Sequence, residues 1–136
     1  MYPKKLMSEV SWGFFGGKYN SFEKFNREVN EYNKECEKEW HPNEIVLNCP
    51  KVTIQYAYWG NAEEDVIEAE FDLVSDNESG FTGGELLFKI HNQVVDQLED
   101  EDHNFFEGLT LLKTQHSNDD FVPYYFINQE SLQLYG

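Results

Sequence analysis

The sequence has no long apolar run and few basic residues in its second half, and these absences exclude several classes of protein. A membrane-spanning helix needs ~20 consecutive apolar residues, and no run approaches that length. Lys4 and Lys5 are not followed by the apolar segment of a secretory signal peptide. We therefore expect a cytoplasmic protein. Nucleic acids and anionic membranes are disfavoured as partners, because both bind cationic surfaces.

Cysteine is also scarce. Cys36 and Cys49 are the two cysteines, and they lack the CxxC or Cys/His spacing of a metal site. Cys36 lies on the buried stripe of a predicted helix, where a thiol is unreactive. We expect both to be reduced thiols packed as small apolar groups. A disulfide between them is the alternative, which a reducing cytoplasm disfavours.

Aromatic residues, by contrast, are abundant. The 136 residues include eleven Phe, eight Tyr and three Trp, and 40% of the chain is hydrophobic. Because disordered chains contain few aromatic residues, this composition indicates a folded protein in spite of its charge. The length fits one domain, which we assign to residues 1–136.

The net charge of −16 is confined to the part of the chain after residue 51. Residues 1–51 contain eight Asp/Glu and eight Lys/Arg, which cancel. Residues 52–136 contain eighteen Asp/Glu and only Lys89 and Lys113 as basic residues. Solubility explains such a charge without any function. The functional explanation is a basic protein partner.

The first predicted helix follows from apolar residues spaced three or four apart between Phe22 and Trp40. Asn20 is the expected N-cap, with Glu23 three residues later. Pro42 is expected to end the helix. The remaining positions are charged or amidic, which is typical of a solvated face.

The second predicted helix begins at the capping-box pattern Thr82-Gly-Gly-Glu85. It runs into an acidic segment, residues 99–102, whose carboxylates oppose the dipole of a helix C-terminus. Such a violation of a local rule tends to mark a functional surface. The apolar stripe of this helix consists of Leu86, Leu87, Ile90, Val94, Val95 and Leu98.

Strands are predicted where apolar and polar residues alternate, or where glycine and proline bound an apolar run. Residues 115–120 are expected to form the loop of a C-terminal hairpin, and Pro123 predicts that the last strand lies at a sheet edge. The predicted strands are 10–16, 52–58, 67–73, 106–113 and 121–128, with a short apolar run at 45–47.

These elements predict an α+β fold in the order β-α-β-β-α-β-β. Two amphipathic helices packed on a largely antiparallel sheet bury both apolar stripes and one face of each strand. The polar residues of the strand 67–73 are Glu68, Glu70 and Asp72, so its outer face is lined by carboxylates. Like charges in a row repel, so this face is either solvated or neutralised by a partner.

Catalytic and metal-binding motifs are absent from the sequence. No GxSxG or HExxH pattern occurs, and the glycines between Gly13 and Lys18 lack the spacing of a phosphate-binding loop. The spacing of the histidines and carboxylates near the end of the second predicted helix favours a solvated acidic helix end over a divalent-metal site. We predict no enzymatic activity, no metal and no cofactor. The weighed metal ligands are His91, Asp96, Glu99, Asp100 and His103.

The candidate partner-binding residues are the carboxylates after residue 51, together with an aromatic residue that strand alternation places outward. Exposed aromatic side chains beside carboxylates suit a protein interface, and electrostatic complementarity speeds association with a basic surface. Simple core packing of the aromatic residues is the alternative. The residues are Glu63, Glu64, Asp65, Glu68, Glu70, Asp72, Glu99, Asp100, Glu101, Asp102, Glu107 and Tyr124.

The block Phe-Thr-Gly-Gly-Glu-Leu-Leu-Phe-Lys-Ile-His-Asn-Gln-Val-Val at 81–95, continuing through 98–109, resembles a segment of small bacterial proteins. In size, acidity and α+β layout the chain is similar to immunity proteins of polymorphic-toxin and contact-dependent inhibition systems. This resemblance implies a cytoplasmic protein that neutralises a cognate toxin, commonly a nuclease, by direct one-to-one binding. It carries over no individual binding residue.

Two other hypotheses stay open at this point. One is a structural protein that forms a homodimer through the predicted edge strand Phe121–Asn128. The other is a small enzyme or metal-binding protein that uses His91, Asp96, Asp100 and His103. The partner expected under the leading hypothesis is a basic protein, with a toxin domain as the specific case.

Overall fold

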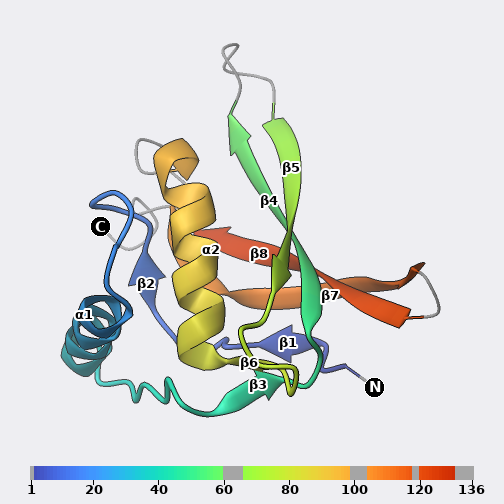
Figure 1. Cartoon of the computed structure of the whole chain (residues 1–136). Coiled ribbons are helices and arrows are strands. Elements are labelled where there is room, and N and C mark those ends of the chain that lie inside the picture. Colours follow the sequence, from blue (N-terminus) through green and yellow to red (C-terminus); the bar gives the residue numbers. More distant parts are fainter. Residues whose placement is uncertain (1, 60–65, 99–103, 118–119, 131–136) are drawn as a thin grey trace.

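The computed structural model describes residues 2–59, 66–98, 104–117 and 120–130. In Figure 1, α2 lies across the sheet, α1 lies beside β2, and the β4–β5 pair crosses the β7–β8 pair and extends beyond it. The elements are β1 (Lys5–Leu6), β2 (Trp12–Gly13), α1 (Phe22–Glu35), β3 (Ile45–Leu47), β4 (Lys51–Trp59), β5 (Val66–Val74), β6 (Phe81–Thr82), α2 (Gly83–Leu98), β7 (Phe105–Ser117) and β8 (Asp120–Glu130).

The larger sheet has the strand order β1-β7-β8-β4-β5, and β2 also pairs with β7. The pair β4–β8 is parallel, whereas β1, β2 and β8 pair with β7 in antiparallel fashion, as does β5 with β4. A second sheet consists of the short antiparallel pair β3–β6. The structure confirms the predicted α+β class with two helices and a largely antiparallel sheet.

The prediction that the last strand lies at an edge is wrong, because β8 lies between β7 and β4. The parallel pairing with β4 begins at Tyr124, opposite Thr53. Pro123 comes one residue before the stretch that pairs with β4, so its missing N–H costs no bond to β4. A homodimer formed through Phe121–Asn128 therefore lacks the free edge that it requires.

The C-terminal hairpin is longer than predicted. β7 continues to Ser117 and β8 begins at Asp120, so most of the predicted loop 115–120 is strand. The register shifts between Phe106 and Leu109, and Gly108, one of the two residues in between, has a φ of +98°. A Cβ atom on Gly108 lies 2.9 Å from Cα of Ser8, so only glycine lets the N-terminal segment cross there.

Helix α1 is shorter than its apolar stripe. It begins after Ser21, whose Oγ accepts a hydrogen bond from the N–H of Lys24 at 3.1 Å, so Ser21 rather than Asn20 is the N-cap. It ends at Glu35, because Glu37 adopts a left-handed conformation with φ of +59°. The predicted end at Pro42 is therefore wrong.

The shorter helix changes the position of Cys36, which is the C-cap and is exposed. The prediction of a buried thiol fails for Cys36 and holds for Cys49. Both cysteines are free, so the disulfide alternative is excluded. The Cys49 thiol donates to the carbonyl of Lys51 at 3.1 Å, and burial raises the pKa of Cys49.

Of the predicted strand 10–16 only β2 forms, and a second short strand, β1, precedes this range. The side chain of Asn33 explains part of this difference. Its Oδ1 accepts from the N–H of Ser11 and its Nδ2 donates to the carbonyl of Ser11, both at 2.9 Å. The fully buried side-chain amide of Asn33 on α1 thus supplies the hydrogen bonds that a neighbouring strand would otherwise give to the backbone of Ser11.

Helix α2 is the central element of the core. Thr82 Oγ1 accepts from the N–H of Glu85 at 3.1 Å, which confirms the predicted cap. Every residue of the predicted stripe is fully buried, together with Val52 and Ile54 from β4. Among the described residues, no helix is both long and apolar enough to cross a membrane.

Candidate binding surface

The three carboxylates of β5 form a row on the face of the sheet that points away from the core. Glu68, Glu70 and Asp72 are exposed, whereas Leu73 belongs to the core. The register with β4 is regular from Lys51 opposite Val74 to Trp59 opposite Val66. We call Glu68, Glu70 and Asp72 the β5 carboxylate row. Its spacing confirms the predicted alternation of the strand.

Neutral donors on β4 hold two of these carboxylates in place. Thr53 Oγ1 donates to Asp72 Oδ1 at 2.7 Å, and Gln55 Nε2 donates to Glu68 Oε2. No ion pair joins the row to any basic side chain of the described residues. The row therefore keeps its negative charge. Sequence reasoning missed Thr53 and Gln55 as supports, although their alternation with Val52 and Ile54 placed them on this face.

The other predicted partner-binding carboxylates do not join the row within the described structure. Residues 63–65 and 99–102 lie outside the described residues, so Glu63, Glu64, Asp65, Glu99, Asp100, Glu101 and Asp102 are not placed. Glu107 lies on β7, which β8 and β4 separate from β5. Residues 68–72 and Glu107 therefore belong to separate surfaces.

Tyr124 is not the exposed aromatic residue that was predicted. It does face opposite to Tyr125, but only 5% of its surface is exposed. The Nζ atom of Lys113 lies 4.9 Å from the centre of the Tyr124 ring, so the ammonium group packs over the ring. The prediction of an exposed side chain is therefore wrong for Tyr124.

Glu107 lines a cleft of about 290 Å³ that α1, β2 and β7 enclose. Lys38 Nζ donates to Ser11 Oγ at 2.6 Å at its margin. Burial, followed by the nearby Cys36 and Glu107, raises the pKa of Tyr32 in the cleft. No described histidine lines it beside Cys36, so we assign no nucleophilic role to this thiol. The lining residues are Ser11, Trp12, Tyr32, Cys36, Lys38, Phe105, Phe106 and Glu107.

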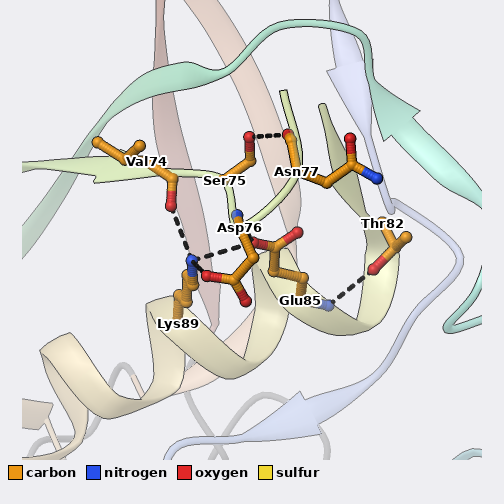
Figure 2. Close-up of polar contacts among 7 residues, drawn as sticks. All are labelled: Val74, Ser75, Asp76, Asn77, Thr82, Glu85 and Lys89. Carbon is orange, nitrogen blue, oxygen red and sulfur yellow. Dashed lines mark hydrogen bonds and ion pairs between the residues drawn. The ribbon is translucent and has the colours of Figure 1, made fainter. Parts of the chain in front are cut away.

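The end of β5 is tied to α2 by Lys89 (Figure 2). Its Nζ atom donates to the carbonyl of Val74 at 2.7 Å and to carboxylate oxygens of Asp76 and Glu85, each at 2.9 Å. Glu85 Oε2 also accepts from the N–H of Asp76 at 2.6 Å. One of the two basic residues after residue 51 is thus committed to intramolecular contacts.

The residues weighed for a metal site have other roles where they are described. His91 is fully buried and both its ring nitrogens are hydrogen-bonded. Asp96 forms an exposed ion pair with Lys18 at 3.3 Å. No group of three potential ligands occurs within the described part of the chain. Residues 99, 100 and 103 lie outside it.

The glycines between Gly13 and Lys18 serve the chain turn before α1. Gly16 and Gly17 have φ angles of +81° and +75°, and the carbonyl of Gly17 accepts a hydrogen bond from His91. This geometry agrees with the structural interpretation of these glycines. Comparisons with protein families, with curated proteins and with solved structures gave no match to the chain.

Proposed function

We propose that this chain is a non-catalytic binding protein that recognises a basic protein partner through the β5 carboxylate row. The observation that supports the proposal is a set of three exposed carboxylates at every second position of one strand, none of which forms an ion pair with a basic side chain in the described structure. A sheet fixes their spacing, so binding costs little ordering of the backbone. Charge of one sign also accelerates encounter with an oppositely charged surface.

The biological role proposed for this binding is that of a cytoplasmic immunity protein, which neutralises a cognate bacterial toxin by direct contact. The support is the resemblance in size, acidity and layout to immunity proteins. A nuclease domain is the favoured class of toxin, because its active site is a basic cleft that binds phosphate groups. The product of a neighbouring toxin-like reading frame is the first partner to test.

The experiment compares association rates with that partner for two triple variants that lose the same charge. The row variant is expected to associate about tenfold more slowly at low salt, and the difference should shrink as the salt concentration rises. The row variant carries Glu68→Gln, Glu70→Gln and Asp72→Asn, and the control carries Glu9→Gln, Glu23→Gln and Glu31→Gln at exposed positions of the N-terminal region.

Equal rates for the two triple variants contradict the role of the row, because net charge alone then accounts for any loss. An association rate that ignores salt contradicts the electrostatic proposal as a whole. A homodimer would have to form through a surface other than β8, and sedimentation of the protein alone at several concentrations tests this alternative. A stable dimer that binds no second protein favours that alternative.

A further inference from the structure

β5 is the last strand of the larger sheet, and β4 is its one partner among the described residues. Native proteins protect edge strands by keeping them short, by bulges, by proline or by charged side chains. β5 has nine residues, contains no proline, and pairs with β4 in unbroken register. Its outer edge is therefore an unbroken row of backbone donors and acceptors, which is a template for a further strand.

The alternation of an antiparallel ladder shows which residues face this edge. In such a ladder the backbone N–H and C=O of every second residue point to the partner strand. The N–H of Ser75 donates to the carbonyl of Pro50 at 2.8 Å, just beyond the strand ends. Because the alternation continues in steps of two, the backbone groups that face β4 include those of Leu73, Phe71 and Ala69. The intervening residues, which include the three of the carboxylate row, then face outward.

Lys89 supports this assignment independently. Val74 is also an outward-facing residue in the same alternation, and its carbonyl accepts from Lys89 Nζ rather than from β4. Lys89 therefore occupies the outward-facing carbonyl of Val74, so a further strand cannot pair with that carbonyl. The backbone groups of Glu68, Glu70 and Asp72 receive no hydrogen bond from other described elements.

We propose that the partner binds by strand addition, as an extended segment with Lys or Arg at every second position, paired on the outer edge of β5. Directly opposed side chains of neighbouring strands lie about 5 Å apart. A basic side chain opposite Glu70 and another two residues away therefore meet the carboxylates at contact distance. The residues between them would face the side of Ile67 and Phe71, so they should be apolar or small.

A second copy of this chain does not fit the same edge. Two β5 strands paired symmetrically about Glu70 would place Glu70 opposite Glu70 and Glu68 opposite Asp72. Like charges directly opposed across a pair are destabilising. The charge of the row thus selects a different, basic strand. This inference rests on the proposed function and adds the geometry of the partner's segment to it.

Three synthetic peptides test the proposal with the intact protein. The first alternates lysine with valine and threonine, the second has the same composition with its lysines in one block, and the third is the alternating peptide with N-methylated backbone. The alternating peptide is expected to slow amide hydrogen exchange at Glu68, Glu70 and Asp72. Because it adds several backbone hydrogen bonds, it should bind about tenfold more tightly than either control.

Equal binding of the alternating and block peptides, with unchanged exchange at the three amides, overturns strand addition. The proposed function survives that result, because the row then attracts cations without backbone pairing. Absence of binding by the alternating peptide also overturns strand addition. The proposed function is judged separately, by the triple variants and the intact partner.

Discussion

The indole N–H of Trp12 donates a hydrogen bond to Nδ1 of His91 at 3.0 Å, and this contact fixes the protonation of the imidazole. Nδ1 must be unprotonated to accept it, so the proton is on Nε2, which donates to the carbonyl of Gly17 at 2.8 Å. The rings of Phe14, Tyr19 and Phe25 surround the histidine. A neutral imidazole thus joins α2 to the N-terminal segment.

This arrangement predicts that acid destabilises the fold. Burial lowers the pKa of His91 from its ordinary 6.5, and the opposing effects of the Gly17 carbonyl and of Glu28 do not reverse the shift. Below pH 6.5 the unfolded chain therefore binds a proton at His91, whereas the imidazole of the native protein stays neutral down to its lowered pKa. Stability from this group is complete above pH 6.5 and is lost as the pH falls below that value towards the lowered pKa.

Chemical denaturation at a series of pH values measures the effect. The variant His91→Gln keeps one acceptor and one donor but does not titrate. The difference between the stability of the wild type and that of the variant should decrease as the pH falls below 6.5. A difference that is constant with pH would show that His91 contributes no pH dependence.

We predict that removal of the buried amide of Asn33 lowers the free energy of unfolding substantially. The variant Asn33→Ala removes both hydrogen bonds to the half-buried backbone of Ser11 and leaves its N–H and carbonyl without these partners. We expect a loss of about 1–3 kcal/mol in the free energy of unfolding. Urea denaturation checks this value. Glu31→Ala, at an exposed position of the same helix, is the control and should change stability by less than about 0.5 kcal/mol.

We predict that removing the charge of Lys89 and removing that of Lys113 lower the stability by different amounts. Lys89→Met retains the packing of the side-chain stem but leaves the mostly buried Glu85 without its ammonium partner, so we expect a loss of about 1–3 kcal/mol. Lys113→Met removes an exposed contact with Tyr124 and should cost less than about 1 kcal/mol. Thermal denaturation of both variants distinguishes the two cases. Equal losses would mean that net charge, rather than the Glu85 contact, determines the effect.

Lys89 also predicts a response at alkaline pH. Burial by itself lowers the pKa of its ammonium group, but the hydrogen bonds to Asp76 and Glu85 raise the pKa above the ordinary 10.5. The stabilisation is therefore complete below pH 10.5 and is lost as the pH rises through the raised value. The Lys89→Met variant should show a smaller loss of stability over that range than the wild type does.

Proline substitution tests which residues of β5 face the open edge. Glu70→Pro removes an outward N–H and should be tolerated, because proline is accepted on edge strands when its N–H side faces solvent. Ala69→Pro removes an inward N–H that pairs with β4 and should destabilise the protein by about 1–3 kcal/mol more than Glu70→Pro does. Thermal denaturation measures both variants. The reverse ranking would contradict the assigned alternation of the ladder.

Local patterns predicted the parts of the fold whose contacts are close in sequence. The cap at Thr82, the buried stripe of α2 and the alternation of β5 all follow from residues a few positions apart. Residue type and spacing are sufficient there, because one helix turn or one pleat determines which side is buried.

Predictions failed where a distant residue decides the structure. Asn33 replaces a strand partner for Ser11, 22 residues away. β8 is interior because it pairs with β4, and Pro123 carries no local sign of that partner. Cys36 follows the helical spacing, but the helix ends one residue before it. The carboxylate row was predicted as exposed, whereas its position at the edge required the sheet order.

The parallel pair at the centre of the sheet determines the order in which the protein can fold. β4–β5 and β7–β8 are hairpins whose strands are neighbours in sequence, so each closes a short loop. Joining them requires contacts such as that between Ala57 and the side chain of Gln129, 72 residues apart. Contacts of that separation form slowly. During synthesis, β4 and β5 leave the ribosome before β8 exists, so the first hairpin is made while both of its edges are open. At the β5 edge, the like charges of the carboxylate row oppose pairing with another copy of the same hairpin.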